Sequence, residues 1–121
     1  MAAKVLTEGE VVELRRLLLA ERARAGRQAA WLQLTYQELV DAADLEPPDD
    51  EHDPDGTTAY ERAQIGSLER ATRIRTDQVS AALEQLDAGT YGRCEQCGDP
   101  IGFPRLTAIL GTQRCVRCAS S

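Results

Sequence analysis

The sequence is poor in aromatic residues and contains no long apolar run. Of its 121 residues only five are aromatic, namely Trp31, Tyr36, Tyr60, Tyr91 and Phe103, which is few for a globular core. Ala, Leu, Glu, Gln and Arg dominate instead, a composition typical of long helices. No apolar run approaches the roughly eighteen residues of a membrane span, and Met1 begins no apolar signal segment. We therefore expect a soluble, cytoplasmic protein with no membrane partner.

Basic residues are outnumbered in this chain. It carries 14 Lys and Arg against 20 Asp and Glu, for a formal net charge of -6. Binding nucleic acid through phosphate contacts needs clustered Lys and Arg, so we expect no sequence-specific DNA binding. Four arginines nevertheless make the C-terminal region locally basic, which leaves weak contact with a nucleic-acid backbone open: Arg93, Arg105, Arg114 and Arg117.

The four cysteines form the most informative motif. They occur as two Cys-x-x-Cys pairs, Cys94 with Cys97 and Cys115 with Cys118, and seventeen residues separate the pairs. Two such turns can present four thiolates to one tetrahedral zinc ion. The alternatives are two disulfides, which are rare in the cytosol, or a redox pair, which does not need a second pair. The spacing therefore predicts one zinc ion bound by all four cysteines.

A zinc ion with four protein ligands has no position left for water, so it should hold structure and not catalyse. The sequence also shows no paired nucleophile and base and no glycine-rich phosphate loop. We therefore do not expect an enzyme.

The N-terminal part of the chain predicts one long helix. Thr7 and Glu10 form a capping box, and apolar residues follow mostly three or four positions apart. Arg15, Arg16, Arg22, Arg24 and Arg27 make this helix basic, either as a solvated face or as a docking surface for an acidic partner. Gly26 predicts a local weakness. The apolar positions are Val11, Leu14, Leu18, Ala25, Leu32 and Leu39.

Residues 41–57 predict a break between two helices. From Asp41 to Asp55 the segment has eight acidic residues and neither Lys nor Arg. Pro47, Pro48 and Pro54 forbid a continuous helix. The segment is either a soluble connector or an acidic tip that is inserted into a partner.

A second long helix is predicted to start after Thr58, which forms a capping box with Glu61, and to end near Ala88 with Gly89 as its cap. Thr72 and Arg75 interrupt its apolar seam. The predicted apolar positions are Ile65, Leu68, Val79, Ala82 and Leu86, with Ile74 and Leu83 widening the stripe.

Two long amphipathic helices joined by a polar break most simply form an antiparallel hairpin. The sequence therefore predicts an all-α fold, with a long helical hairpin resembling a coiled coil over residues 1–88 and a four-cysteine zinc finger over 89–121. The apolar stripe is compatible with a monomer or with a weak homodimer.

The finger resembles that of the TraR/DksA family of RNA-polymerase-binding zinc-finger proteins. The matching residues are Gly89-Thr-Tyr-Gly-Arg-Cys-Glu-Gln-Cys-Gly98, Ile101, Arg105-Leu-Thr-Ala108 and Cys115-Val-Arg-Cys118. The resemblance implies a protein that binds RNA polymerase and slides its hairpin into the secondary channel, where acidic residues at the tip alter promoter complexes. It also implies ppGpp as a small-molecule partner, because some members act with this alarmone.

The acidic tip resembles the family only in part. The best-known members carry Asp-x-x-Asp-x-Ala, and Asp50 and Asp53 have this spacing, whereas Asp55 stands in place of Ala. The resemblance assigns partner binding to Asp50, Asp53 and Asp55. The alternative function is a protein-interaction module, held together by zinc, for another partner such as a sigma-type factor.

Overall fold

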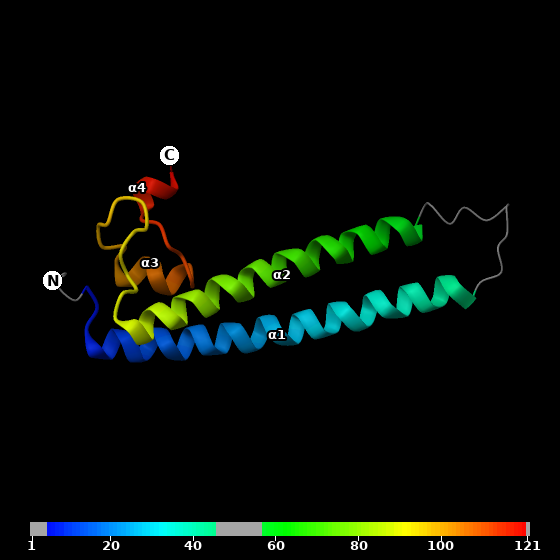
Figure 1. Cartoon of the computed structure of the whole chain (residues 1–121), viewed down its shortest axis with the longest axis horizontal. Helices are drawn as coiled ribbons and strands as arrows, with labels where there is room; N and C mark the ends of the chain where they lie inside the picture. Colours follow the sequence, from blue (N-terminus) through cyan, green and yellow to red (C-terminus); the bar gives the residue numbers. More distant parts are fainter. Residues whose placement is uncertain (1–4, 46–56, 121) are drawn as a thin grey trace. The chain divides into compact units, whose positions relative to one another are not determined.

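A computed structural model describes residues 5–45 and 57–120 (Figure 1). The chain divides into two compact units. The first unit comprises Met1–Arg24 and Thr76–Ser121, and the second comprises Ala25–Arg75. The described residues form four helices and no strand: α1 (Glu8–Leu45), α2 (Thr57–Ala88), α3 (Phe103–Ala108) and α4 (Val116–Ala119). The all-α prediction, with two long helices followed by the finger, is confirmed. Asp50, Asp53 and Asp55 lie outside the described residues.

Helix α1 begins with the predicted capping box. The Glu10 backbone N–H donates to Thr7 Oγ1 at 3.1 Å, and the Thr7 backbone N–H donates to Glu10 Oε1 at 2.9 Å. The helix passes through Gly26 without interruption and continues to Leu45, beyond the last predicted apolar position, Leu39. Residues 41–45 can stay helical because the first proline comes only at Pro47.

Helix α2 ends as predicted, in a Schellman motif. The Gly89 N–H donates to the Leu86 carbonyl at 3.1 Å and the Thr90 N–H to the Gln85 carbonyl at 2.9 Å. Gly89 has φ 76°, a left-handed conformation that glycine adopts without strain. At its other end the helix begins at Thr57, so Thr58 lies inside the first turn and not ahead of it.

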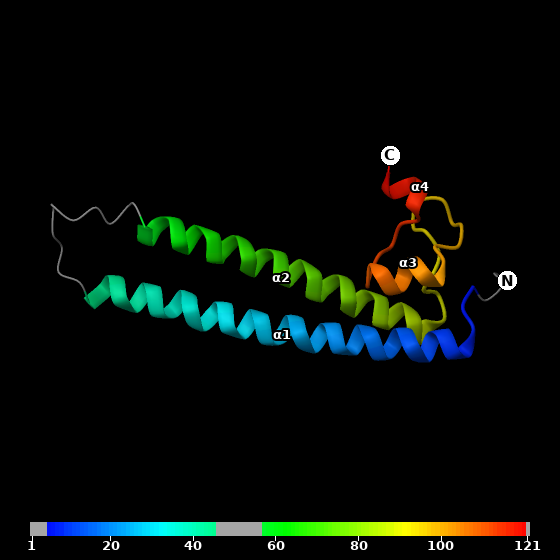
Figure 2. The ribbon, with the colours of Figure 1, turned by 180° about the vertical axis from the view of Figure 1, so that it is seen from behind.

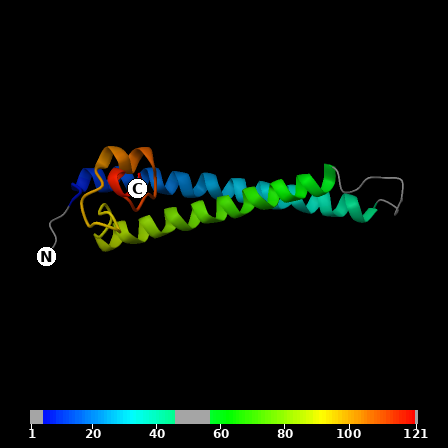
Figure 3. The same ribbon diagram turned by 90° about the horizontal axis from the view of Figure 1, so that it is seen from above.

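The core of the first unit forms where α1 and α2 lie side by side, as seen in Figures 1 and 2 and, from above, in Figure 3. Leu14 and Leu18 of α1 meet α2 along its seam, and both are fully buried. Tyr91 and Leu106 of the finger complete the same cluster, so the finger shares its core with the helices. The α2 members of the cluster are Val79, Ala82, Leu83 and Leu86.

In the second unit α1 contributes the buried Ala25 and Leu32, and α2 contributes the buried Thr72. Thr72 thus lies on the predicted seam, as its spacing of seven residues from Val79 requires. Ile74 was expected to widen the stripe, but it is 58% exposed. It lies five residues from Val79, which at about 100° per residue places it on the far side of α2.

Leu68 is the second departure from the predicted stripe, because 49% of its surface is exposed. Trp31 and Leu34 of α1 are also exposed in this unit. Among the described residues, no helix is long and apolar enough to cross a membrane.

Candidate metal centre

Two backbone turns bring the four cysteines together. Cys94 and Cys97 lie in the loop after α2, Cys115 directly precedes α4, and Cys118 lies within it. Their four sulfur atoms all lie within 4.8 Å of one another, and those of Cys97 and Cys115 are 3.7 Å apart. A zinc tetrahedron with Zn–S bonds of about 2.3 Å has edges of about 3.8 Å. The donor set and spacing therefore fit one zinc ion.

Local hydrogen bonds shape the first turn. The Cys94 N–H donates to the Asp99 carbonyl at 2.8 Å, and the Gly98 N–H donates back to the Cys94 carbonyl at 2.9 Å. Gly98 has φ 79°, which favours glycine. The Gln96 N–H points to the Cys94 sulfur at 3.4 Å, a contact that stabilises a thiolate.

The crowded sulfurs differ in how readily they lose a proton. Backbone hydrogen bonds, first of all that of Cys115, lower the pKa of the Cys94 thiol to about 6. The backbone N–H of Cys118 likewise lowers the pKa of Cys115. A side-chain hydrogen bond with Cys94 raises the pKa of Cys118 to about 12. Without a cation some of the thiols must stay protonated, and a divalent ion removes that constraint by replacing the protons.

Comparison with known proteins agrees with this geometry. The prokaryotic dksA/traR C4-type zinc finger model matches residues 89–121. RNA polymerase-binding transcription factor DksA of Caulobacter vibrioides (strain NA1000 / CB15N) is 41% identical over 46 residues, which is 35% of this chain and 32% of that protein. The chain also resembles the solved structure of transcription factor DksA2 from Pseudomonas aeruginosa, with a TM-score of 0.80 and 23% identity. This match covers 99% of the present chain and 88% of the DksA2 chain. The chain belongs to the DksA/TraR family. An uncharacterized protein of Aquifex aeolicus (strain VF5) is 34% identical over 102 residues, or 84% of this chain and 68% of that protein.

As in a C4-type finger, the cysteines here provide the site of one structural Zn²⁺. The spacing alone identified this cofactor, and the prediction is confirmed. Asp50, Asp53 and Asp55, the residues assigned to partner binding, fall outside the described residues, so their role stays a prediction.

Four arginines make the finger locally basic in sequence. In the structure, all four contact other residues of the finger. Arg117 pairs with Asp99, and Arg114 pairs with Glu95 at 3.3 Å. Arg105 donates to the Arg114 carbonyl at 3.0 Å, and Arg93 donates to the Gly98 carbonyl at 3.1 Å. Two carboxylates and the double negative charge of a zinc tetrathiolate offset the four positive charges, so the described finger is close to neutral.

Sequence reasoning did not identify the residues through which the DksA/TraR finger contacts the helices. Leu106 is fully buried in the core cluster, and the Gln113 side chain donates to Gln85 of α2 at 2.9 Å. Gly111, with φ 86°, lies against the Gln78 backbone, where an added Cβ would come within 3.4 Å. The sequence did contain one signal for this contact. Leu106 is a leucine in the short helix that begins with Phe103 and Pro104, and an apolar residue there indicates a buried face.

Proposed function

We propose that this chain is a transcription regulator that binds RNA polymerase directly. Two observations carry the proposal. The chain shares a C4-type finger with a protein named RNA polymerase-binding transcription factor DksA, and it shares the fold of two long helices and a finger with the structure of transcription factor DksA2. Residues 1–88 form the arm that engages the polymerase, and the zinc finger of residues 89–121 fixes the base of that arm.

In this proposal the hairpin enters the secondary channel and carries the acidic tip toward the catalytic centre. Carboxylates of Asp50, Asp53 and Asp55 near a polymerase Mg²⁺ would compete for the metal or perturb the loops around it, because Mg²⁺ prefers oxygen ligands. Asp55 stands where the family pattern has Ala, so the tip carries one more negative charge than that pattern.

Two features of the described residues support a protein partner over a nucleic acid. The finger is close to neutral and its arginines are engaged internally. In the second unit Trp31 and Leu34 are 63% and 67% exposed. They are three residues apart and so share one helix face. Exposed apolar side chains that adjoin one another are typical of protein interaction surfaces.

The test is co-sedimentation of the zinc-loaded chain with core RNA polymerase, followed by transcription in vitro. A double variant, Asp50→Asn with Asp53→Asn, should bind the polymerase like the parent but lose its effect on promoter complexes. The charge-matched control changes two exposed acidic residues of α2, Asp77→Asn with Glu84→Gln, and should keep both properties.

Absence of binding by the parent chain at micromolar concentration would overturn the proposal and favour another partner, such as a sigma-type factor. If the double tip variant lost binding itself, the tip would be an anchor and not an effector. Strong, salt-dependent DNA binding by the isolated chain would contradict the assignment of a protein partner.

A further inference from the structure

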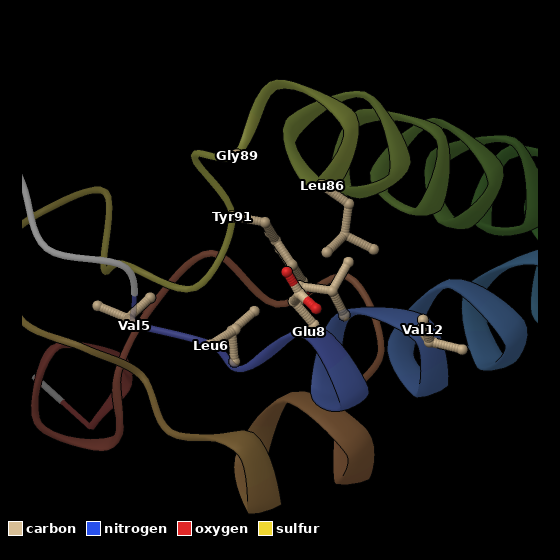
Figure 4. A pocket seen from close by; sticks show the side chains of 8 residues that line it. Val5, Leu6, Glu8, Val12, Leu86, Gly89 and Tyr91 are labelled. Atoms are coloured by element: carbon tan, nitrogen blue, oxygen red, sulfur yellow. The ribbon is translucent and has the colours of Figure 1, made fainter.

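An apolar pocket lies away from the zinc site, between the start of α1 and the end of α2 (Figure 4). It belongs entirely to the first unit and has a volume of about 410 Å³. This lies within the range of about 300–1,000 Å³ for small-molecule sites. Its walls come from the chain ahead of α1, from the first turns of α1, and from the end of α2 and the loop that follows: Val5, Leu6, Val12, Leu86 and Tyr91.

The walls of this pocket are apolar and partly fixed. Leu86 and Tyr91 are core residues and almost fully buried. The Tyr91 hydroxyl already donates to the Thr112 carbonyl at 3.3 Å. Val12 is 65% exposed, so it marks the open side. An entering ligand would therefore meet mostly hydrocarbon and aromatic surface.

One charged side chain lines the pocket. Figure 4 shows Glu8 among the apolar side chains, and among the described residues its carboxylate has no ion-pair partner. The neighbouring arginines do not supply one, because Arg15 pairs with Asp87 at 2.6 Å and Arg16 pairs with Glu13 at 2.5 Å. Glu8 is therefore the one charged residue among the described residues that line the pocket.

The end of α2 adds to the negative potential of Glu8. Gly89, which directly follows the last helical residue, also lines the pocket. A helix C-terminus carries a partial negative charge of roughly half an elementary charge, and the last turn of α2 contains no basic residue to offset it. The N-terminus of α1, which starts at Glu8, brings a partial positive charge of similar size to the same pocket, so the Glu8 carboxylate is the charge that a ligand would chiefly meet.

We propose that this pocket binds a small organic cation with an apolar body, such as a protonated aromatic or branched aliphatic amine. The body packs against Leu6, Leu86 and Tyr91, and the ammonium group pairs with the Glu8 carboxylate. The residues that line this site include none of the four cysteines and none of Asp50, Asp53 and Asp55, and the proposal does not depend on polymerase binding.

The experiment is a titration of the zinc-loaded chain with phenethylammonium chloride, followed by methyl NMR. A probe of about nine heavy atoms should bind with a Kd of roughly 1 mM. Saturable shifts are expected at the methyl groups of Val5, Leu6, Val12 and Leu86, whereas those of Leu32 in the second unit should not move. Phenethyl alcohol, which has the same body without the charge, should bind more weakly.

Variants separate the charge from the shape of the pocket. Glu8→Gln should weaken the amine about three- to five-fold and leave the alcohol unchanged, as expected for a solvent-accessible ion pair. Val12→Lys places an ammonium four residues from Glu8, where it should compete with the probe. Glu38→Gln, the matched control on the same helix, should bind like the parent.

Helix content by circular dichroism, equal to that of the parent, would establish that each variant folds. Failure of the amine to produce saturable shifts at the pocket methyls would overturn the proposal. So would equal affinity of the parent chain for the amine and the alcohol, because the carboxylate would then contribute nothing.

Discussion

The contact between the finger and the helices can be tested at Leu106. Its side chain is fully buried among Leu14, Leu18 and Val79, residues of both long helices. Leu106→Ala removes this contact and leaves a cavity, which typically costs 2–5 kcal/mol, so we expect a loss of about 3 kcal/mol in the free energy of unfolding. At a slope of about 2 kcal/mol per molar urea, the urea midpoint should fall by about 1.5 M.

The matched control is Ile109→Ala, which follows α3 by one residue and is 44% exposed. It should cost about 1 kcal/mol, less than Leu106→Ala, because nearly half of the Ile109 surface stays in water in the folded chain. Both variants are unfolded in urea at a fixed excess of zinc, since metal binding raises apparent stability by mass action. Both should retain one zinc per chain, because the metal site is built from local turns. Equal urea midpoints for the two variants would refute the packing of α3 against the helices.

The other predictions concern the metal and the helix ends. Cys97→Ser or Cys115→Ser should release the zinc measured per chain and loosen the finger while the long helices persist in part; unchanged zinc content in either would contradict the four-cysteine site. Gly89→Ala should lower stability by about 1 kcal/mol, because Gly89 has φ 76°, whereas Gly26→Ala, in open space within α1, should raise it by about 0.5–1 kcal/mol. Thermal unfolding should show a lower melting temperature for Gly89→Ala and a higher one for Gly26→Ala. Equal shifts for the two variants would contradict the role of Gly89 as a helix cap. Thr7→Ala should cost about 1 kcal/mol, because the side-chain half of the capping box is lost; an unchanged melting temperature would show that the box adds nothing.

Much of the fold was predictable because its signals are local. The capping box at Thr7, the glycine cap at Gly89 and the Cys-x-x-Cys turns each need only a few neighbouring residues. The apolar seam of α1 follows helical periodicity, so the burial of Leu14, Leu18, Ala25 and Leu32 was also predictable.

Other features depended on contacts between distant residues. The apolar seam of α2 was harder to assign. Ile74 is exposed because it lies on the face of α2 opposite the seam, and Leu68 is half exposed although its spacing fits the seam. The internal partners of the finger arginines were missed for a similar reason: Arg117 and Asp99 are eighteen residues apart. Periodicity carries no information about such a pair.

The neutrality of the finger bears on where a partner would bind. Arg114 and Arg117 connect the two halves of the finger through Glu95 and Asp99. Arg93 and Arg105 donate to backbone carbonyls within the finger. A partner that bound them would have to break these contacts first, which would offset the electrostatic gain. The exposed Trp31 and Leu34 carry no such cost, because they contact solvent before binding. Partner recognition should therefore be more sensitive to changes on the helices than to changes at the finger surface. The finger would act by fixing the ends of α1 and α2 through Leu106 and Tyr91.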